Sequence, residues 1–223
     1  MFFVIPDLLT SEEVQRVRNK IDAGHFVAGA GTAANPSSAA KNNLQISYQD
    51  TSLDEARDII EKAFARNSMF QFLALPKKVA PPTFNRYDEG MYYKDHIDHA
   101  LIGGEDKVRG DISTTVFLTN PREYVGGELV LQFDGQELPV KLETGQAVVY
   151  SATLMHRVNP VTRGSRIAAV TSIQSTIKNT EQRDLMGDLA RIMRWTQDIA
   201  PDAPENQVLM RVYNNMLRMW AEV

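Results

Sequence analysis

Between residues 80 and 177 the chain alternates short runs of Val, Thr, Tyr and Phe with clusters of Gly, Asn and Asp. The first group favours strands and the second favours turns, so this pattern indicates a succession of short strands. Seven or eight strands at such spacing are typical of a sandwich or a jelly roll. The expected strands are 83–88, 92–98, 112–119, 128–134, 137–142, 147–151, 155–159 and 166–175.

The residues that precede this region read as a strand followed by helices. The opening MFFVIPDLL predicts a first strand, and apolar residues at helical spacing predict helices over 10–22 and 52–67. Between them, residues 27–43 are small and polar and predict a flexible loop. A capping box precedes each helix, formed by Thr10 with Glu13 and by Ser52 with Glu55.

After Lys178 the apolar residues return to helical spacing and predict two further helices, with Pro201 and Pro204 between them. The second of these helices carries a stripe of Met and Trp side chains. Such a stripe is typical either of a packed core or of a subunit interface. We therefore expect the segment to be a helical appendage to the β-rich region.

Composition narrows the chemistry that such a chain can perform. Its 223 residues carry a net charge of −4, so the chain lacks the excess of positive charge that is typical of proteins that bind nucleic acid or an anionic membrane. The absence of Cys excludes disulfides, thiolate zinc sites, iron–sulfur clusters and cysteine nucleophiles. A metal must then be held by Asp, Glu or one of four His. The opening apolar segment is short and lacks a basic start, so we expect a soluble, cytoplasmic protein.

One motif in the β-rich region has the residue types and spacing of a metal site. His96 and Asp98 lie two apart on an expected strand, so alternation places both side chains on the same face. His156, on a later strand, can complete the set from across the barrel. Two imidazoles and one carboxylate that leave open positions are typical of non-haem Fe(II) oxygenases. The simpler interpretation is a strand histidine satisfied by an ordinary hydrogen bond.

Two neighbouring patterns strengthen the metal interpretation. Upstream stands Tyr87-x-x-Gly-x-x-Tyr93-x-x-His96-x-Asp98, and Arg166 follows His156 after nine intervening residues. Tyr93 lies at odd spacing from His96, so it reaches the same face only if the backbone is irregular near Lys94 and Asp95.

This ensemble resembles the prolyl-4-hydroxylase-like branch of the Fe(II)- and 2-oxoglutarate-dependent dioxygenases, and more narrowly the bacterial PKHD-type hydroxylases. The resemblance covers nearly the whole chain. Besides the tyrosine–histidine string, it rests on KNN at 41–43, FNRY at 84–87, GGEL at 126–129, NPVTRG at 159–164 and the segment from 166 to 175.

The resemblance implies a mainly β, α+β fold with a double-stranded β-helix (jelly-roll) core. We expect residues 1–79 to form a helical support region, residues 80–177 the dioxygenase domain and residues 178–223 the C-terminal appendage. By the same resemblance, Fe(II) binds to His96, Asp98 and His156.

The resemblance also implies residues that bind the cosubstrate 2-oxoglutarate. Arg166 is expected to pair with its distal carboxylate, a role that suits a permanently charged, two-pronged guanidinium. Tyr87 or Tyr93 is expected to hydrogen-bond it, with a buried core tyrosine as the alternative for each. Arg157 and Arg163 are weaker anion binders by their positions.

The implied reaction is hydroxylation of an unactivated C–H bond by O₂, with release of succinate and CO₂ from 2-oxoglutarate and with ascorbate as an accessory. The substrate is a small molecule or a peptide, and association of the family with bacterial iron handling favours a siderophore-linked one. Neither nucleic acid nor membrane is an expected partner, and the C-terminal helices are candidates for a homo-oligomer contact.

Two other functions compete with the dioxygenase interpretation. One is a cupin-like metal-binding module or sensor without activity, which has no need of Arg166. The other is a zinc hydrolase that uses Asp95 or Glu89 as a base. Of the remaining histidines, His99 is expected in a second shell or a substrate loop, and His25 on the surface. Residues 99–111 are either a lid over the site or a solvated loop.

Overall fold

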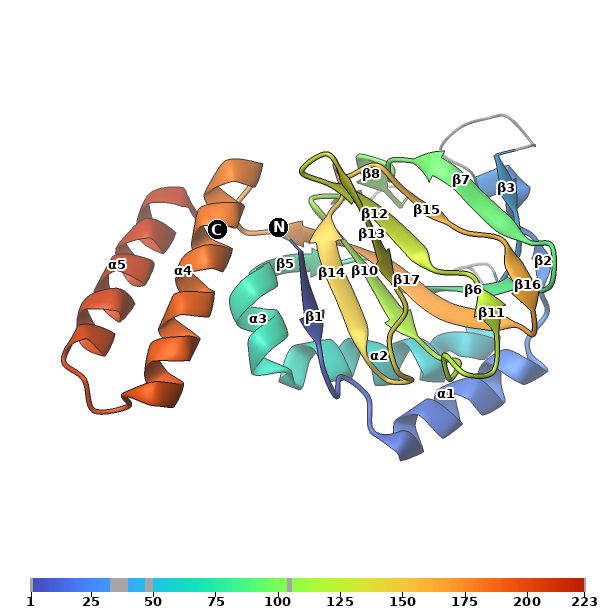
Figure 1. Ribbon diagram of the computed structural model, residues 1–223, viewed down its shortest axis with the longest axis horizontal. Coiled ribbons are helices and arrows are strands. Elements are labelled where there is room, and N and C mark those ends of the chain that lie inside the picture. The colour runs from blue at the N-terminus through green and yellow to red at the C-terminus, as the bar shows by residue number, and fades with distance from the viewer. Residues whose placement is uncertain (1, 33–39, 47–49, 104–105, 223) are drawn as a thin grey trace.

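In the computed structural model, two antiparallel sheets face each other and helices cover the outer side of the larger one (Figure 1). The structure describes residues 2–32, 40–46, 50–103 and 106–222. The larger sheet runs β1 (Phe2–Ile5), β14 (Ala147–Ser151), β10 (Ile112–Phe117), β17 (Arg166–Ser175), β6 (Thr83–Tyr87), β4 (Leu44–Ile46) and β2 (Val27–Ala28), with β5 (Pro76–Val79) also paired to β17.

The smaller sheet lies opposite and provides the other wall of the barrel. Its order is β13 (Gln136–Val140), β12 (Leu129–Phe133), β15 (His156–Val158), β7 (Tyr92–His96) and β3 (Lys41–Asn42). Two short ribbons complete the described strands: β8 (Leu101–Ile102) with β9 (Val108–Arg109), and β11 (Val125–Gly126) with β16 (Val161–Arg163).

Burial follows from this two-layer arrangement. All six residues of β10 are buried, because one face meets the helices and the other faces the barrel interior. The larger apolar core lies between the large sheet and the helices, and a smaller, more aromatic core lies between the sheets. The expected strands are all present, with ends within two residues of prediction, and β1 confirms the expected first strand.

Helices α1 (Ser11–Ala23), α2 (Asp54–Arg66) and α3 (Ser68–Ala74) lie along the large sheet (Figure 1). The capping box of Thr10 and Glu13 is present, with reciprocal bonds of 2.9 and 3.2 Å. The second expected box is wrong. A 3-10 turn, η2 (Thr51–Leu53), stands there, and Asp50 rather than Ser52 caps it, because its carboxylate accepts from the Ser52 amide at 3.0 Å.

The expected loop over 27–43 is also wrong for the part that the structure describes. Residues 27–28 form β2, residues 29–32 form the 3-10 turn η1 (Gly29–Thr32), and residues 41–42 form β3. These residues take a regular structure because their backbones pair at the sheet edges, β2 with β4 and β3 with β7. Residues 33–39 of this segment lie outside the described residues.

Helices α4 (Thr180–Ile199) and α5 (Glu205–Trp220) form a hairpin beside the barrel (Figure 1). The ring of Tyr213 stacks on Phe72 at 4.3 Å, and its hydroxyl donates to the Phe72 carbonyl at 3.0 Å. The expected stripe on α5 therefore packs in part against the core. Among the described residues, no helix is both long and apolar enough to cross a bilayer.

Candidate metal centre

His96 ends β7, and an irregularity in that strand places two aromatic rings on one face. His96 pairs with His156, yet Tyr93 pairs with Val158, so β7 has one residue more than β15 between these pairs. Lys94 and Asp95 occupy the bulge and are exposed, whereas Tyr93 and His96 both point inward. Their rings stack at 3.5 Å. The irregular backbone that the odd spacing of Tyr93 required is therefore present.

Asp98 lies just beyond the strand, which ends two residues earlier than expected. Its side chain still faces the same way as His96, since Ile97 between them is 50% exposed and Asp98 is half-buried. The Ser113 hydroxyl on β10 donates a hydrogen bond to Asp98 Oδ2. This bond fixes the carboxylate from the opposite sheet and leaves Oδ1 facing the two imidazoles.

His156 comes from the neighbouring strand rather than from across the barrel. β15 pairs with β7, and His156 is the direct partner of His96. The expectation that His156 lies across the barrel from His96 was wrong. The alternation of side chains along a strand predicts the face that each side chain takes, but not which strands lie adjacent. The two rings lie 4.2 Å apart between centroids.

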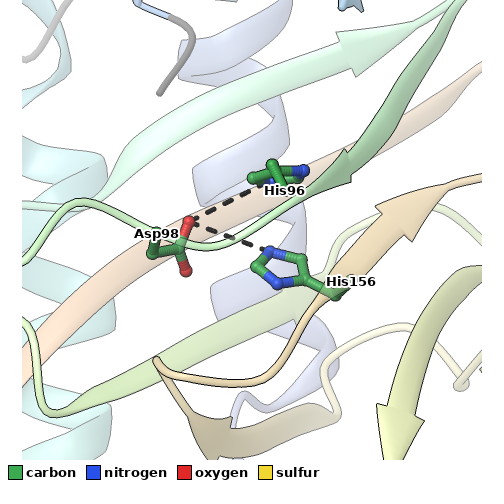
Figure 2. A group of neighbouring side chains, drawn as sticks. All are labelled: His96, Asp98 and His156. Carbon is green, nitrogen blue, oxygen red and sulfur yellow. Dashed lines mark ion pairs between the residues drawn. The ribbon is translucent and has the colours of Figure 1, made fainter. Parts of the chain in front are cut away.

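The three side chains present a ready set of metal ligands (Figure 2). The Nδ1 atoms of His96 and His156 lie 2.7 and 3.0 Å from backbone carbonyls, which only accept, so each Nδ1 carries the proton. The lone pair of each Nε2 then faces Asp98 Oδ1, at 3.9 and 3.8 Å. One ligand atom from each residue lies within 4.8 Å of the others. This donor set fits Fe(II).

Burial, followed by the nearby His156, lowers the pKa of His96 to about 4. The imidazole is therefore neutral at physiological pH. Neutral imidazole is the form that binds a metal, because protonation would occupy the Nε2 lone pair.

Arg166 lies at the start of β17, directly opposite Tyr87 on β6. Its side chain is 2% exposed, and its guanidinium lies 5.4 Å from the ring centroids of Tyr87 and Phe117. Its Nε has no hydrogen-bond partner among the described residues. A buried cation with an unused donor is a strong anion-binding group, because a carboxylate would both neutralise it and satisfy the N–H.

The two candidate tyrosines have different surroundings. Tyr87 packs beside Arg166, and burial raises its pKa while the guanidinium opposes that rise. Tyr93 instead stacks on His96. Sequence reasoning missed Tyr124 and Tyr150, two further buried tyrosines; burial also raises their pKa, and Arg166 partly offsets the rise. Nothing in their spacing distinguishes them from ordinary core tyrosines.

Lys41 is a second buried cation that sequence reasoning missed. It is 7% exposed, and its Nζ donates to Gln45 Oε1 at 3.1 Å and lies 5.0 Å from the Tyr93 ring centroid. Burial lowers the pKa of Lys41 to about 8, and the charge of Asp98 partly opposes this. The sequence feature that could have pointed to Lys41 was the KNN string at 41–43, which contributed to the family resemblance but was assigned no function.

A cavity of about 400 Å³ lies between the two sheets, a size in the range of small-molecule sites. It is lined by the three candidate ligands together with Lys41, Tyr87, Tyr93, Tyr150 and Arg166. A second cavity of about 490 Å³ borders it. The two share Pro81, Thr83, Ile102 and Gly103, so the second cavity adjoins the first beside the β8–β9 ribbon. His99 lines the first cavity, in keeping with a substrate-loop position.

The alternative anion binders and hydrolytic bases that the sequence suggested lie away from this cavity. Arg157 pairs with Glu137 at 2.6 Å, and Arg163 is exposed at the end of β16. Asp95 is exposed and accepts from Gln132 at 3.3 Å, and Glu89 is exposed too. Neither Asp95 nor Glu89, the two bases considered for a zinc hydrolase, is therefore among the described residues that line the cavity.

We expect Gly127→Ala to lower the free energy of unfolding by roughly 2–4 kcal/mol. Gly127 has φ +66°, and a Cβ there would approach Val161 Cγ2 to 2.9 Å and Arg166 Cδ to 3.2 Å. Gly135→Ala is the matched control, since Gly135 has φ +75° with open space around it. Urea unfolding measures the free energy of unfolding of both variants. If the two substitutions lower it equally, a packing contact between Gly127 and Arg166 is contradicted.

Sequence comparisons agree with this geometry. The family model described as 2OG-Fe(II) oxygenase superfamily matches residues 82–174, and that of the PKHD-type hydroxylase C-terminal domain matches residues 181–222. A PKHD-type hydroxylase of Methylobacterium nodulans is 40% identical over 227 positions, which span the whole of both chains.

Structural comparisons give the same fold at low sequence identity. A Pseudomonas putida prolyl-4-hydroxylase matches 78% of this chain and 92% of its own, with a TM-score of 0.54 and 19% identity. HygX of Streptomyces hygroscopicus, solved with nickel, 2-oxoglutarate and hygromycin B, matches 78% and 83%, with a TM-score of 0.54 and 15% identity. The expected double-stranded β-helix fold is thus confirmed.

Proposed function

The chain belongs to the PKHD-type hydroxylases of the 2OG-Fe(II) oxygenase superfamily, and on this basis we propose specific roles for the residues around its cavity. His96, Asp98 and His156 hold Fe(II). Arg166 holds the distal carboxylate of 2-oxoglutarate. The observation that carries this proposal is the convergence of three ligand atoms within 4.8 Å, in the same cavity as a buried arginine.

When bound, Fe(II) with 2-oxoglutarate and O₂ supplies the oxidising power to hydroxylate an unactivated C–H bond, with release of succinate and CO₂. The task of the chain is to bind, orient and exclude water. Backbone carbonyls hold His96 and His156 by their Nδ1 protons, and Ser113 holds Asp98, so the ligand atoms are oriented before the metal arrives.

Tyr87 is the better candidate for a hydrogen bond to the cosubstrate, because its ring lies beside Arg166. Tyr93 acts on the metal centre instead, by stacking against the His96 ring and limiting its rotation. The aromatic walls of the cavity keep the site low in water and strengthen the attraction between Arg166 and a carboxylate.

The substrate is a small molecule or a peptide, and the adjoining cavity beside the β8–β9 ribbon is the side from which it approaches. A siderophore-linked substrate, ascorbate as an accessory, a cytoplasmic location and the absence of nucleic-acid or membrane partners stay predictions of the sequence. A homo-oligomer through the C-terminal helices is supported by apolar side chains left exposed on α4. These are Leu185, Ile192, Trp195 and Ile199.

We expect anaerobic protein mixed with Fe(II) and 2-oxoglutarate to develop the weak visible charge-transfer band of a metal-bound keto acid. The reason is that three protein ligands leave positions for bidentate 2-oxoglutarate. Absorption spectroscopy measures the band, with Fe(II) plus succinate as the control, since succinate lacks the keto group. A wild-type protein that binds iron yet shows no band would contradict the proposed function.

A further inference from the structure

The second cavity, of about 490 Å³, has walls made mainly of hydrocarbon. Val79 at the end of β5 and Pro81 just after it line one side, and Ile102 and Val108 line the side formed by the β8–β9 ribbon. The proposed reaction gives this cavity no task beyond the entry of the substrate. Its size alone is in the range of a small-molecule site.

The polar side chains among its described lining residues already bond to partners. The Thr83 hydroxyl donates to the Val170 carbonyl at 3.3 Å. Lys78 Nζ lies 3.6 Å from Asp106 Oδ1, and both of these side chains are exposed, so their ion pair lies at the rim, next to solvent. Water against apolar walls makes few hydrogen bonds there, so an apolar group displaces it favourably.

Polarity changes from the first cavity to the second. The first contains the three candidate ligands and Arg166, whereas the second lies beyond the shared residues and is apolar. Leu101 precedes the shared Ile102, lines the first cavity and is 58% exposed, which adds apolar surface near the junction. A molecule that reacts at the metal centre and is longer than the first cavity therefore extends from polar into apolar surroundings.

Both walls of the second cavity are tied to β17, so the space exists before a ligand arrives. Val79 pairs with Ile173 on that strand. On the other wall, the backbone amide of Arg109, the neighbour of Val108 on β9, donates to Gln174 Oε1 at 3.1 Å. A preformed site binds more tightly than one that the ligand must order, because less conformational entropy is lost.

Resting on the proposed function, we propose that the second cavity binds an apolar chain or ring of the substrate while the carbon to be hydroxylated lies at the metal centre. The substrate is then a molecule with a hydrocarbon extension beyond its reacting carbon. Val79, Ile102 and Val108 select for this extension, since each buried CH₂ strengthens binding and each buried polar group without a partner weakens it.

The test uses neutral alkyl amides as probes, in the absence of turnover. Calorimetry on the anaerobic Fe(II)·2-oxoglutarate enzyme would measure the binding of N-ethyl-, N-butyl- and N-heptylacetamide. We expect the affinity to rise roughly three- to fourfold for each added CH₂. A diether analogue, in which oxygens replace two CH₂ groups of the heptyl chain, should bind at least about tenfold more weakly than N-heptylacetamide.

Two substitutions place a polar amide against the apolar walls. Val79→Asn and Ile102→Asn should each lower the preference for the heptyl chain over the diether to about threefold or less, and the second variant keeps the test independent of how well the first one folds. The matched control is Val125→Asn, since Val125 is 44% exposed on β11 and is not among the described lining residues of either cavity. It should retain the full preference. The keto-acid band shows in each variant that the metal and cosubstrate site is intact.

Separate outcomes would overturn the inference and the function on which it rests. If the preference persists in both cavity variants, or is missing in a wild type that shows the band, the second cavity does not bind the apolar group and the proposed function is unaffected. A preference lost in Trp195→Ser would also overturn the inference, because the probe would then bind on α4, where Trp195 is 61% exposed. A wild type without the keto-acid band contradicts the proposed function itself, whichever amide binds.

Discussion

Replacing His96 by alanine is expected to abolish the visible band of the Fe(II)·2-oxoglutarate complex. Succinate release should fall by more than about 100-fold, because loss of a residue that only supports a metal ligand already costs up to about that factor. In the proposed site this imidazole supplies one of three ligand atoms, and it is held in place by its Nδ1 bond to the Lys94 carbonyl. The remaining Asp98 and His156 cannot complete the facial set. Anaerobic spectroscopy and metal analysis measure the loss.

The control for this substitution is His25→Ala. His25 is exposed and lies outside the cavity lining, so its removal should leave the band and the bound iron unchanged. A band of undiminished intensity in His96→Ala would contradict the assignment of this imidazole as a ligand. A band lost equally in both variants would indicate general damage rather than loss of a ligand.

Replacing Arg166 by methionine is expected to raise the KM for 2-oxoglutarate by roughly a hundredfold or more while iron content stays near that of wild type. The guanidinium is buried, its Nε has no partner among the described residues, and it lies over the rings of Tyr87 and Phe117. Methionine fills much of the same space between Tyr87 and Phe117, which limits the effect on packing. Titration of 2-oxoglutarate in the succinate assay measures the change.

Two further variants separate binding from structure in this prediction. Arg166→Lys retains the charge but loses the two-pronged geometry, so we expect an intermediate KM. Arg163→Met removes an exposed arginine at the end of β16 and should leave the KM as in wild type. If Arg166→Met instead loses its iron and keeps its affinity for 2-oxoglutarate, Arg166 is structural.

These two predictions test different parts of the cavity. The candidate ligand cluster is tested by iron content and the visible band, and the Arg166 end by the affinity for 2-oxoglutarate. Each part has its own measurement because the two groups contact different neighbours.

Local patterns were sufficient for most of the strands and for singling out the three residues of the candidate metal centre. Alternation predicted that His96 and Asp98 share a face, and their burial agrees with it although the strand ends at His96. The odd spacing of Tyr93 required a bulge, and the register between β7 and β15 contains one. Such features depend on residues only a few positions apart, so a sequence displays them directly.

Other features depend on contacts between distant segments. The small and polar residues 27–43 looked like a loop, yet Lys41 is buried there because β3 adds to the edge of β7. His156 was expected from across the barrel, but strand pairing makes it the direct neighbour of His96. The period of a strand specifies which face a side chain takes, and it contains no information about which strand lies beside it.

The sequence by itself determined the class of chemistry. With no Cys and four His, a metal had to be held by imidazole and carboxylate, and the strings around His96, Asp98, His156 and Arg166 resembled those of the Fe(II)- and 2-oxoglutarate-dependent dioxygenases. Only the tertiary structure decided which tyrosine lies beside Arg166 and that Lys41 adds a second cation to the cavity. The physical reason is that ligand type is a property of single residues, whereas burial and charge balance arise only when strands from both sheets enclose the same space.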